Sequence, residues 1–141
     1  MPVLIANRQK THRIQTRTLQ SRARKLLDAL GSPDGELSIV IVSDDEMADL
    51  NRQYRKKRGP TNVLSFPMLE GPGAELAPSL LGDVVISADT AFAEAQAARK
   101  SLLYRMTELL IHGILHLLGH DHATEKEWQG FHRIQKRILS L

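Results

Sequence analysis

The chain has 141 residues, 42% of them hydrophobic and 25% charged, a mixture that suits one folded domain and excludes wholesale disorder. It has no cysteine, which excludes disulfides and thiolate metal ligands and fits a reducing cytoplasm. The net charge of +3 is by itself weak evidence for a nucleic-acid partner. The N-terminal residues do not resemble a signal peptide, and the longest apolar stretch, 109–118, is too short to span a bilayer. We therefore expect a cytoplasmic protein with no membrane partner.

The first half of the chain predicts alternating strands and helices. Hydrophobic periodicity indicates a strand, a basic helix and a buried strand, in that order, at Val3–Ile5, Thr16–Leu30 and Glu36–Val42. Ser43 and Glu46 form a capping box, which predicts the start of a second helix. That helix is expected to carry Met47, Leu50 and Tyr54 inward and to end near a cluster of basic residues.

The second half of the chain begins where Gly59 and Pro60 interrupt the pattern. We then expect a strand at Asn62–Phe66 that Pro67 stops, followed by a mobile loop at Leu69–Ser79 and a further strand at Leu81–Ser87. Two helices follow, at Asp89–Arg99 and Leu102–Leu118. A capping box at Thr124–Glu127 opens a final helix that runs to Leu141. Together these elements predict an α+β fold, a single domain over 1–141 in which a small sheet of about four strands is covered by about five helices.

The predicted helix at 102–118 is apolar on most faces, which indicates a buried helix that can serve as a rigid platform. It carries His112 and His116, which lie four residues apart in sequence and about 40° apart around the helix axis, so both can aim at one point. Gly119 can adopt the left-handed conformation that ends a helix, and the chain would then bring His122 back to the same point. Three imidazoles that leave a fourth tetrahedral position to water are the layout of a catalytic zinc site.

A single histidine on an apolar helix is more often a hydrogen-bonded core residue than a metal ligand. Two buried imidazoles one turn apart each need polar partners, which an apolar helix rarely supplies, and a shared metal ion satisfies both. We therefore predict one zinc ion bound by His112, His116 and His122. Nickel, copper and iron also accept this type of ligand.

The histidine spacing matches that of the metzincin zinc proteases, H-E-x-x-H-x-x-G-x-x-H, with one difference. Gly113 stands where those enzymes carry the glutamate that takes a proton from the attacking water. The ligands for the ion are present and the base beside them is missing. Protease chemistry is therefore rejected as the first interpretation.

Other polar residues near the histidines have competing roles. Asp121 either accepts a hydrogen bond from a ligand imidazole and so orients it, or forms a turn before the final helix, and the two roles fit equally well. Glu108, one turn before the first ligand, fits the orienting role less well. His120 is expected to point away from the ion, and His12 and His132 are expected to be structural.

The region His112–His122 resembles the signature of the YbeY-type endoribonucleases, the ribosomal RNA maturation factors. Two further blocks of that family are matched by Asn51–Arg55 with Pro60–Pro67, and by Leu81–Ser87. Order, spacing and total length agree, so the resemblance covers nearly the whole chain. His120 stands where the family often has tyrosine, and Asn62 where it often has aspartate. Neither position is a metal ligand.

The resemblance implies a metal-dependent endoribonuclease directed at single strands, which acts on the 3′ end of small-subunit ribosomal RNA and in ribosome quality control. It also implies a mixed sheet packed with helices and a zinc ion held by His112, His116 and His122. Arg55 matches the arginine proposed to be essential for activity in the family. The implied partners are single-stranded RNA, ribosomal RNA and the small ribosomal subunit, while the oligomeric state stays open.

The residue chemistry agrees with this function. Zinc lowers the pKa of a bound water far below that of bulk water, toward about 7, or polarises a phosphoryl oxygen directly. A guanidinium can stabilise the negative charge that builds up on the phosphorus oxygens, and Arg55 is our candidate for that group. Lys56, Lys57 and Arg58 are expected to track the RNA backbone. Most of the few aromatic residues are expected to lie in the core, so base stacking and sequence specificity should be limited.

Two questions stay open at this point. The attacking group is either the zinc-bound water or the RNA 2′-hydroxyl, because the sequence places no evident carboxylate base near the histidines. The competing functions are a non-catalytic ribosome-assembly module with a structural metal, and a metal-dependent hydrolase of another substrate such as a peptide.

Overall fold

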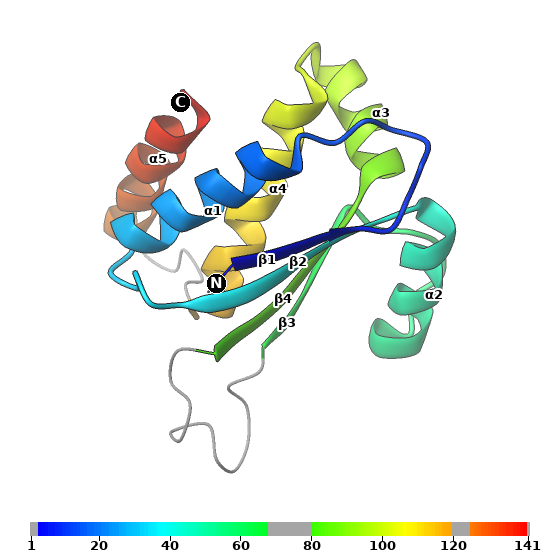
Figure 1. The fold of residues 1–141 in the computed structure, drawn as a ribbon, viewed down its shortest axis with the longest axis horizontal. Helices are drawn as coiled ribbons and strands as arrows, with labels where there is room; N and C mark the ends of the chain where they lie inside the picture. Colours follow the sequence, from blue (N-terminus) through cyan, green and yellow to red (C-terminus); the bar gives the residue numbers. More distant parts are fainter. Residues whose placement is uncertain (1–2, 68–79, 120–124, 141) are drawn as a thin grey trace.

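The computed structural model describes residues 3–67, 80–119 and 125–140. Its elements follow in the order β1 (Val3–Asn7), α1 (Thr16–Ala29), β2 (Glu36–Val42), α2 (Asp44–Arg55), β3 (Val63–Pro67), β4 (Leu80–Ser87), α3 (Ala88–Ala98), α4 (Leu102–Leu117) and α5 (Glu125–Leu139) (Figure 1). The predicted α+β fold in one small domain is confirmed. The expected loop at Leu69–Ser79 and the expected capping residue Thr124 lie outside the described residues. No helix in the described ranges has both the length and the apolarity needed to cross a membrane.

The strands of the described residues form one mixed sheet in the order β1-β2-β4-β3. β1, β2 and β4 run parallel, and β3 runs antiparallel to β4 at the edge of the sheet. Pro67 was expected to stop β3 but is its last residue, paired with Gly82. An edge strand tolerates a proline because one side of the strand needs no N–H donor.

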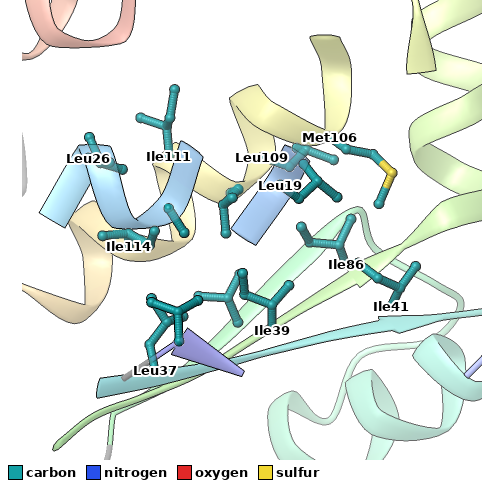
Figure 2. Packing of buried hydrophobic residues seen from close by; sticks show 14 of the residues in the cluster. Leu19, Leu26, Leu37, Ile39, Ile41, Ile86, Met106, Leu109, Ile111 and Ile114 are labelled. Atoms are coloured by element: carbon teal, nitrogen blue, oxygen red, sulfur yellow. The ribbon is translucent and has the colours of Figure 1, made fainter. Parts of the chain in front are cut away.

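One face of the sheet carries the main hydrophobic core. The residues of β2 alternate between the two faces, so Leu37, Ile39 and Ile41 point to this one, where α1 and α4 cover them (Figure 2). Leu19 of α1 and Ile114 of α4 are fully buried in the same layer. Each fully buried aliphatic side chain contributes about 1.5–3 kcal/mol. The layer therefore holds α4 firmly on the sheet.

The opposite face of the sheet is covered only in part. α2 lies on this side of the sheet (Figure 1), and Met47 packs there in a small second cluster with Val42, Leu64 and Val85. Tyr54 was predicted to point into the core but is 60% exposed, so that prediction is wrong. The periodicity places Tyr54 on the inward stripe of α2, but the last turn of the helix borders an open hollow, where the ring stays largely exposed.

Short-range signals set the ends of the helices. The Ser43 hydroxyl accepts a hydrogen bond from the Glu46 amide at 3.3 Å, which confirms the capping residue predicted for α2. The Glu46 carboxylate, expected to complete the capping box, pairs with Arg8 at 3.0 Å. Gly119 has a φ of +80° directly after α4, the left-handed conformation predicted for it.

Candidate functional site

Gly113 lets α4 approach the sheet closely. A Cβ atom at this position would lie 2.6 Å from Cγ1 and 3.0 Å from Cγ2 of Val84, a fully buried residue of β4. The position at which the zinc proteases carry their glutamate therefore points into the sheet and has no room for a side chain. Packing explains the missing base, in agreement with the rejection of protease chemistry.

The two histidines of α4 flank this contact. Around the helix axis, His112 and His116 lie about 40° apart and about 60–100° away from the direction of Gly113, so both emerge at the side of the helix next to β3. Both are exposed, which differs from the expectation of buried imidazoles. The apolar residues on most faces of α4 predicted a buried helix, but the edge of the sheet ends beside this turn and leaves the histidine side in contact with solvent.

β3 supplies a hydroxyl partner for one of the imidazoles. Ser65 Oγ lies 2.5 Å from Nδ1 of His116. Ser65 is the register partner of Val84, so it lies on the α4 face of the sheet. A hydrogen bond at Nδ1 orients the ring and directs Nε2 toward any further ligand. Sequence reasoning did not single out Ser65, although alternation within the predicted strand places it on the same face as Val63.

Side chains from two helices fix the start of β3. The Asn62 side-chain amide donates to both carboxylate oxygens of Glu94 in α3 at 3.3 Å. Arg105 in α4 donates to the same carboxylate at 3.1 Å and to Glu108 at 3.2 Å. These contacts hold β3 against α4 and so place the Ser65 hydroxyl beside the imidazole. Glu108, considered above as an orienting residue for a ligand, contacts Arg105.

The C-terminal end of α2 brings a guanidinium to the same place. Arg55 is the last residue of α2, and that helix packs on the other face of the sheet. The Arg55 side chain reaches the histidines around the edge strand β3. A cavity of about 340 Å³ is lined by Arg55, Val63, Leu64, Ser65, His112, Gly113 and His116. The structure thus brings together the predicted catalytic arginine and two of the three predicted metal ligands.

Beyond Arg55, an exposed basic segment continues outside the cavity lining and consists of Lys56, Lys57 and Arg58. Lys56 has a left-handed backbone, with φ 56° and ψ 33°, and the chain turns there at the end of α2. The Asn51 side-chain amide donates to the Gly59 carbonyl at 2.9 Å, which ties the far end of the segment back to α2. The segment is therefore presented on a defined turn.

The remaining predicted site residues, Asp121 and His122, lie outside the described residues, as does His120. Within the described ranges, no group of three or more histidine, aspartate or glutamate side chains is gathered as a metal site. The predicted trio of ligands therefore stays a prediction. The donors that are described fit a divalent ion, because two imidazoles one turn apart line one cavity and Ser65 holds a ring nitrogen of His116, a common arrangement for ligand imidazoles.

Two further histidines lie away from this cavity. His12 Nε2 is 2.9 Å from one carboxylate oxygen of Asp89, and the other oxygen accepts a hydrogen bond from the Asp44 amide at 2.8 Å. The contact joins the segment before α1 to the first turns of α2 and α3, in agreement with a structural role. His132 of α5 lines a separate cavity of about 470 Å³ together with Tyr104 of α4.

The fold and the site together define a class of small α+β protein in which a helix-borne histidine pair and an arginine meet at the edge of a mixed sheet. The family described as Endoribonuclease YbeY matches residues 4–141. The chain belongs to this family, which confirms the resemblance seen in its sequence.

Relatives named Endoribonuclease YbeY are similar over most of their length. The protein from Geobacter sulfurreducens is 50% identical over 143 aligned positions, which cover 100% of this chain and 95% of that one. The protein from Geobacter metallireducens is 50% identical over 127 positions, which cover 90% of this chain and 85% of that one. The protein from Thermus thermophilus is 42% identical over 116 positions, which cover 82% of this chain and 83% of that one. A Thermotoga maritima protein with a known solution structure shares the fold, with a TM-score of 0.67, 23% identity, and coverage of 98% of this chain and 89% of that one.

Proposed function

We propose that this chain is a metal-dependent endoribonuclease that cleaves single-stranded RNA, acting on the 3′ end of small-subunit ribosomal RNA and in ribosome quality control. Its partner would be the small ribosomal subunit in the cytoplasm. Membership of a family described as Endoribonuclease YbeY supports the reaction. The single observation that carries the proposal is the cavity that Arg55 shares with His112 and His116, residues from two helices on opposite faces of the sheet.

The proposed cofactor is one zinc ion held by His112, His116 and His122, with Asp121 as the acceptor that orients one imidazole. A divalent ion at that place would polarise the scissile phosphate or lower the pKa of a bound water molecule. The exposure of His112 and His116 supports a site that substrate can reach. A structural metal, in contrast, normally has all of its positions closed by protein ligands.

The side chains around the cavity have distinct tasks in this proposal. Arg55 donates paired hydrogen bonds to the phosphate oxygens and stabilises the charge that builds up there. Ser65 holds the His116 ring in one orientation. Lys56, Lys57 and Arg58 bind phosphates that follow along the strand and give binding that weakens with salt.

Product analysis identifies the attacking group, which is either water or the RNA 2′-hydroxyl. Attack by the 2′-hydroxyl leaves a 2′,3′-cyclic phosphate as the first product, whereas attack by water does not. Mass spectrometry of early products separates the two routes.

The decisive experiment measures metal content and cleavage of an unstructured RNA on the same samples of the wild type, His116→Ala, Arg55→Glu and Arg99→Glu. We expect His116→Ala to lose bound metal and cleavage, and Arg55→Glu to keep metal and fold but lose cleavage. Arg99→Glu makes the same charge change at an exposed position outside the cavity and should cleave like the wild type. Full activity of a folded, metal-free sample would contradict the proposal, and RNA binding with no cleavage by the wild type would favour the assembly module.

A further inference from the structure

A second cavity lies on the other face of the sheet from the histidines. It has a volume of about 380 Å³ and is lined by Arg8, Val40, Val42, Glu46, Leu50, Tyr54, Phe66, Asp83 and Val85. We call it the sheet hollow. Its floor is the uncovered part of the sheet beside α2, and its size falls within the range of about 300–1,000 Å³ that is typical of small-molecule sites.

Two aromatic rings form one wall of the sheet hollow. The ring centroids of Tyr54 and Phe66 lie 5.2 Å apart, with the planes at 68° in an edge-to-face arrangement. Tyr54 is 60% exposed although it belongs to the inward stripe of α2. A flat, apolar partner that entered the hollow would cover this ring, and an RNA base is such a partner because every base has a π face.

The sheet hollow is continuous in sequence with the histidine cavity. Tyr54 directly precedes Arg55 on α2, and Phe66 directly follows Ser65 on β3. Successive residues of a strand point to opposite faces, so β3 presents Ser65 to His116 and Phe66 to the hollow. A nucleic-acid strand that crosses the edge of the sheet at β3 would therefore meet one cavity on each face.

The sheet hollow also carries polar groups beside its aromatic wall. Asp83 is the register partner of Phe66, so its carboxylate lies beside the aromatic wall. A carboxylate accepts hydrogen bonds from base N–H groups, and guanine presents two of them side by side on its Watson–Crick edge, whereas uracil presents a single N–H between two carbonyl groups. Arg8 pairs with Glu46 at 3.0 Å and keeps most of its side chain exposed beside the hollow.

We propose that the sheet hollow binds one unpaired RNA base, with guanine preferred, next to a phosphate held at Arg55. The proposal rests on the proposed endoribonuclease function and adds base selectivity to it. It also differs from the expectation, drawn from the sequence, that aromatic residues stack little on RNA bases. That expectation placed Tyr54 in the core, whereas the ring is exposed.

The test measures the affinity of the metal-loaded 141-residue protein for three labelled RNA chains of about ten nucleotides. These are oligouridylate, the same chain with one guanosine, and an abasic ribose-phosphate chain, each checked for integrity after titration. We expect the wild type to bind the guanosine-containing chain at least about fivefold more tightly than oligouridylate, and Asp83→Asn to remove this difference. Tyr54→Ala should weaken binding of both base-containing chains about fivefold or more and leave the abasic chain unaffected.

Two variants control for the loss of an aromatic ring. Tyr54→Phe keeps the ring and should bind like the wild type. Tyr104→Ala removes a tyrosine from α4 that lines neither the sheet hollow nor the histidine cavity, and it should also bind like the wild type. Equal affinities of Tyr54→Ala and Tyr104→Ala for all three chains would overturn the proposal, as would equal affinity of the wild type for guanosine and uridine.

Cleavage measured on the same samples separates the base site from the proposed function. If the wild type cleaves RNA but Tyr54→Ala binds every chain as the wild type does, the base site is wrong and the endoribonuclease function stands; the hollow then becomes a candidate surface for a protein partner. If the wild type neither binds nor cleaves any of the chains, both proposals are wrong.

Discussion

At the scale of single residues, the contact between Ser65 and His116 links the sheet to the proposed metal site. A ligand imidazole binds well only when its ring is held in one orientation, and the partner of the other ring nitrogen supplies that constraint. Here the partner is a hydroxyl on an edge strand, 2.5 Å from Nδ1. In the proposed zinc site, the register of β3 would therefore set the orientation of a ligand ring.

Replacing Ser65 with alanine should lower the affinity for zinc about 10–100-fold, because the His116 ring loses its orienting partner. Zinc affinity can be measured by competition with a chromophoric chelator. Ser65→Thr keeps the hydroxyl on a residue that suits a strand, and it should bind zinc as the wild type does. Equal zinc affinity of Ser65→Ala and the wild type would show that the contact has no such role.

Gly113 offers a second test at the residue scale. In a helix, alanine is intrinsically better than glycine by ~1 kcal/mol, but here a Cβ would meet the rigid, fully buried Val84 at 2.6 Å. Overpacking of this kind typically costs about 1–3 kcal/mol, so the clash should outweigh the propensity. We expect Gly113→Ala to lower the free energy of unfolding, measured with denaturant.

Two further variants identify the cause of that loss. Gly130 lies in α5 with no atom within 4 Å of an added Cβ, so Gly130→Ala should raise stability by up to ~1 kcal/mol. In a Val84→Ala background, Gly113→Ala should cost less stability than it does in the wild type, because the colliding methyl groups are absent. A strictly additive double-mutant cycle would exclude the clash as the cause.

At the scale of secondary-structure elements, the end of α2 combines backbone strain with a proposed RNA contact. Lys56 and Arg99 are the two described non-glycine residues with positive φ, both at 56°, and each follows the last turn of a helix. This conformation costs an L-residue roughly 1–2 kcal/mol. Glycine avoids that cost, but it also gives the unfolded chain more freedom, so only part of the cost appears as added stability. The pair therefore forms a matched comparison.

Lys56→Gly and Arg99→Gly should each raise the free energy of unfolding by up to ~1 kcal/mol, since both relieve the same backbone strain. Their effects on RNA should differ. Lys56→Gly removes a proposed phosphate contact and should lower the slope of log affinity against log salt concentration by about one, whereas Arg99→Gly should leave the slope unchanged. The same slope in both variants and in the wild type would remove Lys56 from the RNA interface.

At the scale of the whole molecule, the hydrophobic layer between α1, α4 and the sheet is independent of the proposed metal. His112 and His116 lie at the exposed edge of that layer, and its buried residues are aliphatic side chains and methionine. Removing the metal with a chelator should therefore abolish cleavage but preserve the helical circular dichroism signal and cooperative thermal unfolding. Returning zinc should restore cleavage. Unfolding on chelation, as in a zinc finger, would instead assign the metal a structural role.

Short-range rules predicted most of the elements of this fold. The aliphatic run of β2 predicted a buried strand, the apolar stripe of α1 predicted a helix with one inward side, and the mostly apolar α4 predicted a buried helix, because such patterns report where an element is apolar. The serine at the start of α2 and the glycine after α4 were also predicted, since capping depends on a few neighbouring residues. The prediction for Tyr54 was wrong because periodicity reports the stripe of a helix but not whether another element covers it.

For the site, the spacing of His112 and His116 by itself determined that two imidazoles share one side of a helix, because helical geometry is local. The tertiary structure decided what meets them. Arg55 arrives from the far face of the sheet and Ser65 from its edge, through a strand order and a close helix–sheet contact at Gly113 that arise from packing between distant segments. It also decided that the other face of β3 opens onto an aromatic hollow, since burial depends on which elements the whole chain places against one another.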